Sequence, residues 1–179
     1  MDRDTLEELY HKHFAKAYHS AYMVTGNVQL AEDATQEAFL KAFTNLHTLK
    51  EIAKFGSWIS VIVTNCAIDI LRKNKKIILT DNENDYLNSD LENSPQDSWE
   101  QQETCQEVRS ALQMLDPEDR EILVLKYFNE LSIQEIAELT SLPTGTIKSR
   151  LFRTREKFRL LLQPEIKKKR HLNKDTDKF

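Results

Sequence analysis

Glycine and proline are both scarce in this sequence, with 3 and 4 residues respectively among 179. Folds built from sheets and tight turns use both residues at their turns, whereas helix interiors exclude them. The composition therefore predicts an all-α fold. The chain length predicts one or two small domains.

Cysteine is almost absent, since the chain has only Cys66 and Cys105. Their wide separation matches neither a disulfide framework nor the ligand spacing of a zinc site. Cys66 falls on an apolar helical stripe and is predicted to pack in the core. His11, His13 and His19 lie on one predicted helix without a cysteine cluster, so we expect no bound metal and no cofactor.

The sequence also lacks a secretory signal and any apolar run near the roughly 20 residues that a membrane span needs. These absences predict a cytoplasmic protein. No acid/base, nucleophile or metal-ligand constellation stands out, so we expect neither an enzyme acting on nucleic acid nor a small-molecule substrate.

Charge is unevenly distributed along the chain, whose formal net charge is −4. Residues 77–108 contain nine acidic residues and no Lys or Arg, whereas residues 143–179 contain twelve Lys or Arg against four Asp or Glu. A basic C-terminal third on an acidic whole indicates a local nucleic-acid interface.

Three segments of the N-terminal part show the apolar periodicity of helices. They are about Asp4 to Met23, Val28 to Leu46 and Phe55 to Lys73. Gly26 separates the first segment from the second, and Asn27 can cap the helix that follows it. Three helices of this length can close a small bundle, which we assign to residues 1–76.

The middle of the chain is polar, acidic and without periodicity, so residues 77–104 are predicted to be a flexible linker. Periodicity returns in residues 105–163. There, Ser132-Ile-Gln-Glu135 is a capping box that opens a short helix, Ser141 to Pro143 is expected to form a tight turn, and a last helix follows to about Leu162. The basic tail, residues 164–179, is expected to be frayed.

Two short helices joined by a tight turn, the second of them basic, are typical of a helix-turn-helix. When Ile147 and Leu151 face the core, the outward positions of the last helix combine hydroxyls with arginines. These positions are Thr146, Ser149, Arg150 and Arg153, with Lys148 beside them. Arginine can make paired hydrogen bonds to guanine, and Thr or Ser can contact bases or phosphates. The alternative is a solvated basic face that only keeps the helix soluble.

A polar patch lies on the second predicted helix, where Asp33, Gln36 and Glu37 are three and four residues apart. A solvated face is the usual explanation of such a patch. Paired carboxylates could also serve acid/base chemistry, but no histidine partner or phosphate loop accompanies them.

The third predicted helix begins with aromatic residues and ends with polar and basic ones. Trp58 lies near its start, and its later part carries Asn65, Asp69, Arg72 and Lys73. Basic charge with aromatics nearby can hold a nucleic-acid single strand by stacking. The alternative is that Trp58 packs in the core, because it falls on the apolar stripe.

Together these segments resemble the extracytoplasmic-function branch of the sigma-70 family. Region 2.2, which docks on the clamp helices of the polymerase beta-prime subunit, resembles AEDATQEAFLKAF (Ala31 to Phe43). Regions 2.3 and 2.4, which melt and read the −10 element, resemble FGSWISVIVTNCAIDILRK (Phe55 to Lys73). Region 4, which reads the −35 element and touches the beta flap, resembles the segment from Leu115 to Phe158. Three blocks in this order are far more specific than the helix-turn-helix alone.

The resemblance implies a role for residues in each block. The implied polymerase contacts are Asp33, Gln36, Glu37, Phe39 and Lys41. The implied −10 contacts are Trp58, Asn65, Asp69, Arg72 and Lys73. The implied −35 contacts are Thr144, Thr146, Lys148, Ser149, Arg150 and Arg153. Gly56 and Thr64 depart from the family, because relatives commonly carry basic or larger residues there, and the loss of an arginine at position 64 affects the expected grip on promoter phosphates.

The sequence thus predicts two helical domains, a region 2 bundle and a region 4 helix-turn-helix domain, that act as an alternative sigma factor. By resemblance, its partners are core RNA polymerase and promoter DNA. An anti-sigma factor, often membrane-anchored in this family, would hold it inactive until a stress or envelope signal. The alternative is an ordinary helix-turn-helix regulator that binds an operator without polymerase and uses its N-terminal bundle for dimerisation or a ligand.

Overall fold

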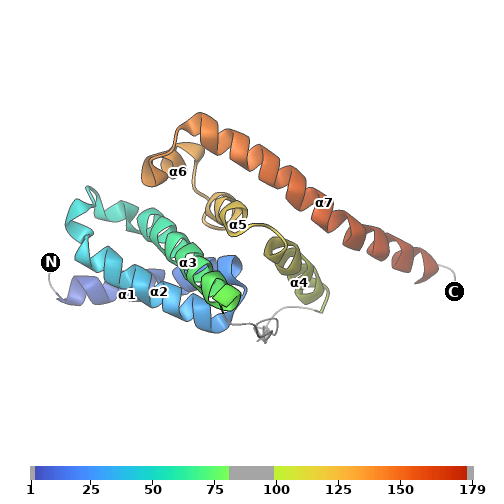
Figure 1. Ribbon diagram of the computed structural model, residues 1–179, viewed down its shortest axis with the longest axis horizontal. Coiled ribbons are helices and arrows are strands. Elements are labelled where there is room, and N and C mark those ends of the chain that lie inside the picture. Colours follow the sequence, from blue (N-terminus) through green and yellow to red (C-terminus); the bar gives the residue numbers. More distant parts are fainter. Residues whose placement is uncertain (1–2, 81–98, 177–179) are drawn as a thin grey trace.

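The computed structural model describes residues 3–80 and 99–176, and every element in them is helical (Figure 1). This confirms the predicted all-α fold. The N-terminal half consists of α1 (Arg3–Thr25), α2 (Val28–Thr44) and α3 (Phe55–Thr80), with two short 3-10 turns, η1 (Leu46–Thr48) and η2 (Ile52–Lys54). The C-terminal half consists of α4 (Trp99–Gln113), α5 (Pro117–Leu123), the π-helical turn η3 (Val124–Phe128), α6 (Ile133–Thr140) and α7 (Thr144–Thr176).

Helices α1, α2 and α3 form a three-helix bundle in which each helix contacts the other two. Gly26 ends α1 with a φ of +67°, a left-handed conformation that favours glycine. Asn27 then caps α2, because its side-chain oxygen accepts a hydrogen bond from the Leu30 amide at 3.0 Å. The inner face of α2 is a row of fully buried alanines, which are Ala31, Ala34, Ala38 and Ala42. Their small side chains allow α2 to pack closely on its neighbours.

The bundle core is rich in aromatic rings around Phe55, which is fully buried. Phe39, from α2, is 3% exposed, and its ring centroid lies 4.8 Å from that of Tyr10. Cys66 is 1% exposed in the same core, which confirms its predicted packing role.

Among the described residues, one segment is long and apolar enough to cross a membrane, namely Ile52–Asn74 with a mean hydropathy of 1.3. This differs from the expectation that the chain lacks such a run. Half of that stretch is buried, and α3 packs on both α1 and α2. Its apolar residues are therefore those of the central helix of the bundle.

The C-terminal half is built around α5, which contacts both α4 and α7. Its core contains Leu125, Ile136 and Ile147, each 1% exposed. The predicted capping box is confirmed: the Ser132 hydroxyl accepts from the Glu135 amide at 3.1 Å, and the Glu135 carboxylate accepts from the Ser132 amide at 2.8 Å.

Three helix ends differ from the predictions. Helix α3 continues past Lys73 to Thr80, and α4 already begins at Trp99, so both ends of the predicted linker 77–104 are helical. Residues 81–98 lie outside the described residues. Helix α7 continues to Thr176, whereas a frayed tail was expected after residue 163. The residues around positions 165–170 are mostly Glu, Lys and Arg, which are strong helix formers.

The two halves pack against each other, which the sequence did not predict. Val124 and Phe128, from the C-terminal half, join the core of the N-terminal bundle. Val61, from α3, is 4% exposed and joins the C-terminal core. In Figure 1, α4 and α5 lie between the three-helix bundle and the long α7.

Candidate DNA-binding and polymerase-binding faces

The helix-turn-helix consists of α6, a turn at Ser141 to Pro143, and the start of α7. Ser141 allows the sharp turn because its φ is +56°, and its amide donates back to the Ala137 and Glu138 carbonyls. Ile147 and Leu151, on the inner face of α7, are buried in the core of the C-terminal half. Five of the six predicted −35 contacts are exposed, and these are Thr144, Thr146, Lys148, Ser149 and Arg153. The structure therefore brings them together on one accessible end of α7.

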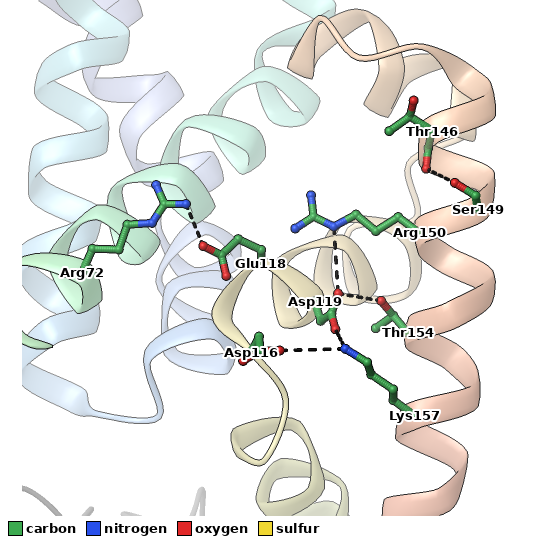
Figure 2. A network of polar contacts seen from close by, with 9 residues as sticks. All are labelled: Arg72, Asp116, Glu118, Asp119, Thr146, Ser149, Arg150, Thr154 and Lys157. Atoms are coloured by element: carbon green, nitrogen blue, oxygen red, sulfur yellow. Dashed lines mark hydrogen bonds and ion pairs between the residues drawn. The ribbon is translucent and has the colours of Figure 1, made fainter.

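Arg150, the sixth predicted −35 contact, is directed at α5 (Figure 2). Its side chain is 26% exposed, and its Nε lies 4.0 Å from the Asp119 carboxylate. The same carboxylate accepts hydrogen bonds from Thr154 at 3.0 Å and from Lys157 at 2.6 Å. Burial raises the pKa of Asp119, but the hydrogen bonds from Lys157 and Thr154 outweigh burial and leave that pKa lowered. Asp119 is thus a charged anchor that fixes α7 on α5.

Phe152 was not among the predicted DNA contacts, yet its side chain is 68% exposed on α7. It follows buried Leu151 and precedes exposed Arg153. An exposed phenylalanine on such a helix can contact a thymine methyl group. The signal was present in the sequence, because the core spacing of Ile147 and Leu151 leaves position 152 outside.

On α2, the predicted polymerase-binding face carries exposed Asp33 and Gln36. Glu37 is half-buried and accepts a hydrogen bond from Lys41, whose Nζ lies 2.7 Å from its carboxylate. This hydrogen bond lowers the pKa of Glu37 and raises that of Lys41. Leu40, which sequence reasoning missed, is 70% exposed and lies four residues after Gln36, so it shares their face.

Phe39 needs a different interpretation from the one the resemblance implied. Its ring packs between Tyr10 and Phe43, with centroid distances of 4.8 and 5.6 Å. At 3% exposure, it has almost no surface to offer a partner in this structure. Phe39 instead packs in the bundle core, behind the exposed face of α2.

On α3, the predicted −10 contacts Asn65, Asp69, Arg72 and Lys73 are all exposed. Trp58 is partly buried and packs on the core, with its ring centroid 6.1 Å from that of Phe55. Both of its interpretations therefore have some support, because the ring contributes to the core and still has exposed surface.

The two departures from the family pattern have structural explanations. A Cβ atom at Gly56 would lie 3.0 Å from the His13 ring, so a larger residue would displace that ring. Thr64 is fully buried, and its hydroxyl lies 3.3 Å from the Glu121 carboxylate of α5. In this structure, position 64 faces the other half of the protein.

Two family models match separate parts of the chain. Residues 9–77 match Sigma-70 region 2, and residues 105–158 match Sigma-70, region 4. The first match covers nearly all of the three-helix bundle, and the second covers most of α4, all of α5, η3 and α6, and the start of α7.

The chain is also similar to individual sigma factors over most of its length. It is 33% identical over 177 residues to the ECF RNA polymerase sigma factor SigW of Bacillus subtilis, covering 90% of this chain and 91% of SigW. It is 29% identical to the ECF RNA polymerase sigma factor SigM of the same organism, covering 88% and 94% of the two chains.

Among solved structures, the sigma factor RpoE of Bartonella quintana, in complex with the anti-sigma factor NepR, has a TM-score of 0.73. The match covers 90% of this chain and 98% of RpoE at 23% identity. CnrH, solved in complex with the cytosolic domain of CnrY, has a TM-score of 0.63 at 20% identity, and the match covers 91% of this chain and 90% of CnrH. These likenesses confirm the fold.

Proposed function

The chain belongs to the extracytoplasmic-function group of the sigma-70 family and is an alternative sigma factor, and from this premise we propose how its three faces are used. The α2 face, with Asp33, Gln36, Glu37 and Leu40, binds the clamp helices of core RNA polymerase. The exposed end of α3 reads and melts the −10 element, and the start of α7 reads the −35 element. The protein itself works in the cytoplasm and has no catalytic chemistry.

The observation that carries this proposal is the exposed end of α7 together with the exposed face of α2. The α7 residues combine small hydroxyls with Arg153 beside a tight turn, the arrangement with which a recognition helix enters the major groove. Asp33, Gln36 and Leu40 lie on a helix whose opposite face is buried alanine, so this surface is free for a protein partner. An operator-binding regulator would need only the first of these faces.

We further propose that an anti-sigma factor controls this protein. RpoE, whose fold this chain shares, was solved in complex with an anti-sigma factor. The inhibitor of this chain would block the α2 or α7 face and release it on a stress or envelope signal.

Reconstitution with core polymerase tests the proposed function directly. The protein would be added to bacterial core RNA polymerase on genomic DNA, and the transcript starts would be sequenced. We expect starts that share an upstream pair of elements and that need the added protein. Tight binding to an operator by a protein that ignores polymerase would instead support an ordinary regulator.

Arg153→Ala should weaken recognition of the −35 element. Arg153 is exposed at the end of α7, and losing one base contact costs about 1–3 kcal/mol and relaxes preference at one position. Transcription from a library of promoters with randomised −35 bases would measure that preference. Arg159→Ala is the matched control, because Arg159 is exposed farther along α7 and pairs with Glu156 at 3.1 Å. An equal loss on every promoter would identify Arg153 as a phosphate contact.

A further inference from the structure

Helix α7 has a polar stripe on the side that it turns towards α5. Its members are Arg150, Thr154 and Lys157, which are four and three residues apart and therefore lie along one edge of the helix. All three contact one carboxylate, that of Asp119 in α5 (Figure 2). Its oxygens lie 4.0 Å from the Arg150 Nε, 3.0 Å from the Thr154 hydroxyl and 2.6 Å from the Lys157 Nζ. A single acidic side chain thus joins three positions of α7 to α5.

These polar contacts are directional, whereas the apolar contacts beside them are not. Ile147 and Leu151 bury the inner face of α7, but the free energy of apolar burial depends on area and not on direction. Hydrogen bonds weaken steeply when donor and acceptor are misaligned. Thr154 is fully buried and the Asp119 side chain is only 15% exposed, so little water competes for their hydrogen bond. Asp119 therefore fixes the rotation of α7 about its own axis, and with it the direction of the exposed residues.

Arg150 lies on the border between this polar stripe and the exposed face of α7. It follows Thr146 by four residues and precedes Arg153 by three, so it neighbours both on the helix surface. From this position its long side chain could reach a DNA phosphate, yet the guanidinium is directed at α5 and the side chain is 26% exposed. Burial raises the pKa of Glu121 in α5, and the positive charge of Arg150 opposes that effect. Arg150 is thus held among carboxylates of α5.

We propose that Asp119 is a positioning residue that determines the specificity of −35 recognition. By holding Arg150, it prevents a phosphate contact that would not depend on sequence. By holding Thr154 and Lys157, it orients α7 so that the exposed residues meet the base edges. Phosphate contacts supply affinity without sequence information, whereas base contacts supply preference. The proposal rests on the proposed function, because it concerns the same −35 face, and it removes Arg150 from the residues that contact DNA there.

Asp119→Asn tests this proposal. Asparagine keeps the size of the side chain and an oxygen that can accept from Thr154, but it removes the charge that holds Arg150. The full-length variant is assembled with core polymerase, and its affinity is measured for a promoter duplex and for the same duplex with a scrambled −35 element. Both titrations are repeated at several salt concentrations, because each added phosphate contact steepens the dependence of log affinity on log salt concentration by about 0.9.

We expect Asp119→Asn to steepen the salt dependence by about 0.9 on both duplexes, because the released Arg150 then contacts a phosphate. The preference for the intact −35 element should fall at least about fivefold, the lower end of the effect of one lost base contact. Adding Arg150→Gln to Asp119→Asn should restore the wild-type salt dependence, since the released cation is then absent. A double variant that stays as steep as Asp119→Asn would contradict the assignment to Arg150.

Asp116→Asn is the matched control, because it removes the same charge three residues earlier in the chain. The Asp116 side chain is 78% exposed and lies 3.8 Å from Lys157, which keeps its shorter contact to Asp119. This control should retain the wild-type salt dependence and the wild-type preference. Equal changes in the two variants would reduce the effect to a general loss of negative charge and overturn the proposal. An Asp119→Asn protein that behaves like wild type would overturn it as well.

Arg150→Gln alone decides the question if Asp119→Asn fails to fold. We expect this single variant to keep the wild-type salt dependence, because Arg150 contacts Asp119 and not a phosphate. A dependence shallower by about 0.9 would show that Arg150 already contacts a phosphate, and the proposal would be wrong. A wild-type holoenzyme without any preference for the intact −35 element would instead overturn the proposed function. The salt dependence on the scrambled duplex would still test how Arg150 is held, because phosphate contacts do not depend on sequence.

Discussion

Replacing Asp33 and Gln36 together by alanine should weaken binding to core polymerase by about 2–5 kcal/mol, the usual loss when one partner of a buried, hydrogen-bonded charge pair is truncated. Both side chains are exposed on α2. Exposed substitutions usually change the free energy of unfolding by no more than about 0.5 kcal/mol. Helicity and thermal unfolding would confirm the fold before affinity is measured for core polymerase and for the isolated clamp helices.

The matched control removes an acidic and a polar side chain at the same spacing on another helix. Glu8→Ala with His11→Ala does this on α1, where both residues are exposed. The control should bind core normally. A folded Asp33→Ala, Gln36→Ala protein that binds core at the wild-type level and still starts transcripts would rule out the α2 face as the docking site.

Phe39→Ala should lower the free energy of unfolding by about 3–5 kcal/mol, because it removes a buried aromatic ring and leaves a cavity. Phe39 is 3% exposed and lies beside the rings of Tyr10 and Phe43. Chemical denaturation of the purified variant measures the loss. The affinity for polymerase should decrease only indirectly, because the lost ring distorts the α2 face.

Phe39→Leu is the companion variant, since it keeps most of the apolar volume and should recover much of the stability and of the binding. The opposite pattern would contradict the core assignment. If Phe39→Ala were as stable as wild type but failed to bind core, the ring would be a direct polymerase contact.

Helix caps and helix faces could be predicted from the sequence, because they depend on residues only three or four positions apart. The capping box from Ser132 to Glu135 was readable because both of its hydrogen bonds join residues three apart. Asn27 was a predictable cap for the same reason. The exposed candidates on α7 followed from the core spacing of Ile147 and Leu151, since a helix that buries one face exposes the other.

Contacts between distant residues were beyond such reasoning. Thr64 was considered only as a lost phosphate contact, whereas its partner Glu121 is 57 residues away in the chain. Arg150 was grouped with the outward residues, but Asp119 of α5 attracts it from a helix whose position depends on tertiary packing. Phe39 was assigned by its place in a motif, and its burial depends on rings from α1 and α3.

The burial of Cys66 makes its thiol a built-in reporter of bundle opening. Burial raises the pKa of this thiol against the opposing effect of Lys41, whose Nζ lies 3.4 Å from its sulfur. The thiolate is the reactive form of cysteine, so peroxide and alkylating reagents should modify Cys66 slowly in the folded protein. Its rate of alkylation then reports how often α2 and α3 separate. While the bundle is folded, oxidants should leave Cys66 unmodified.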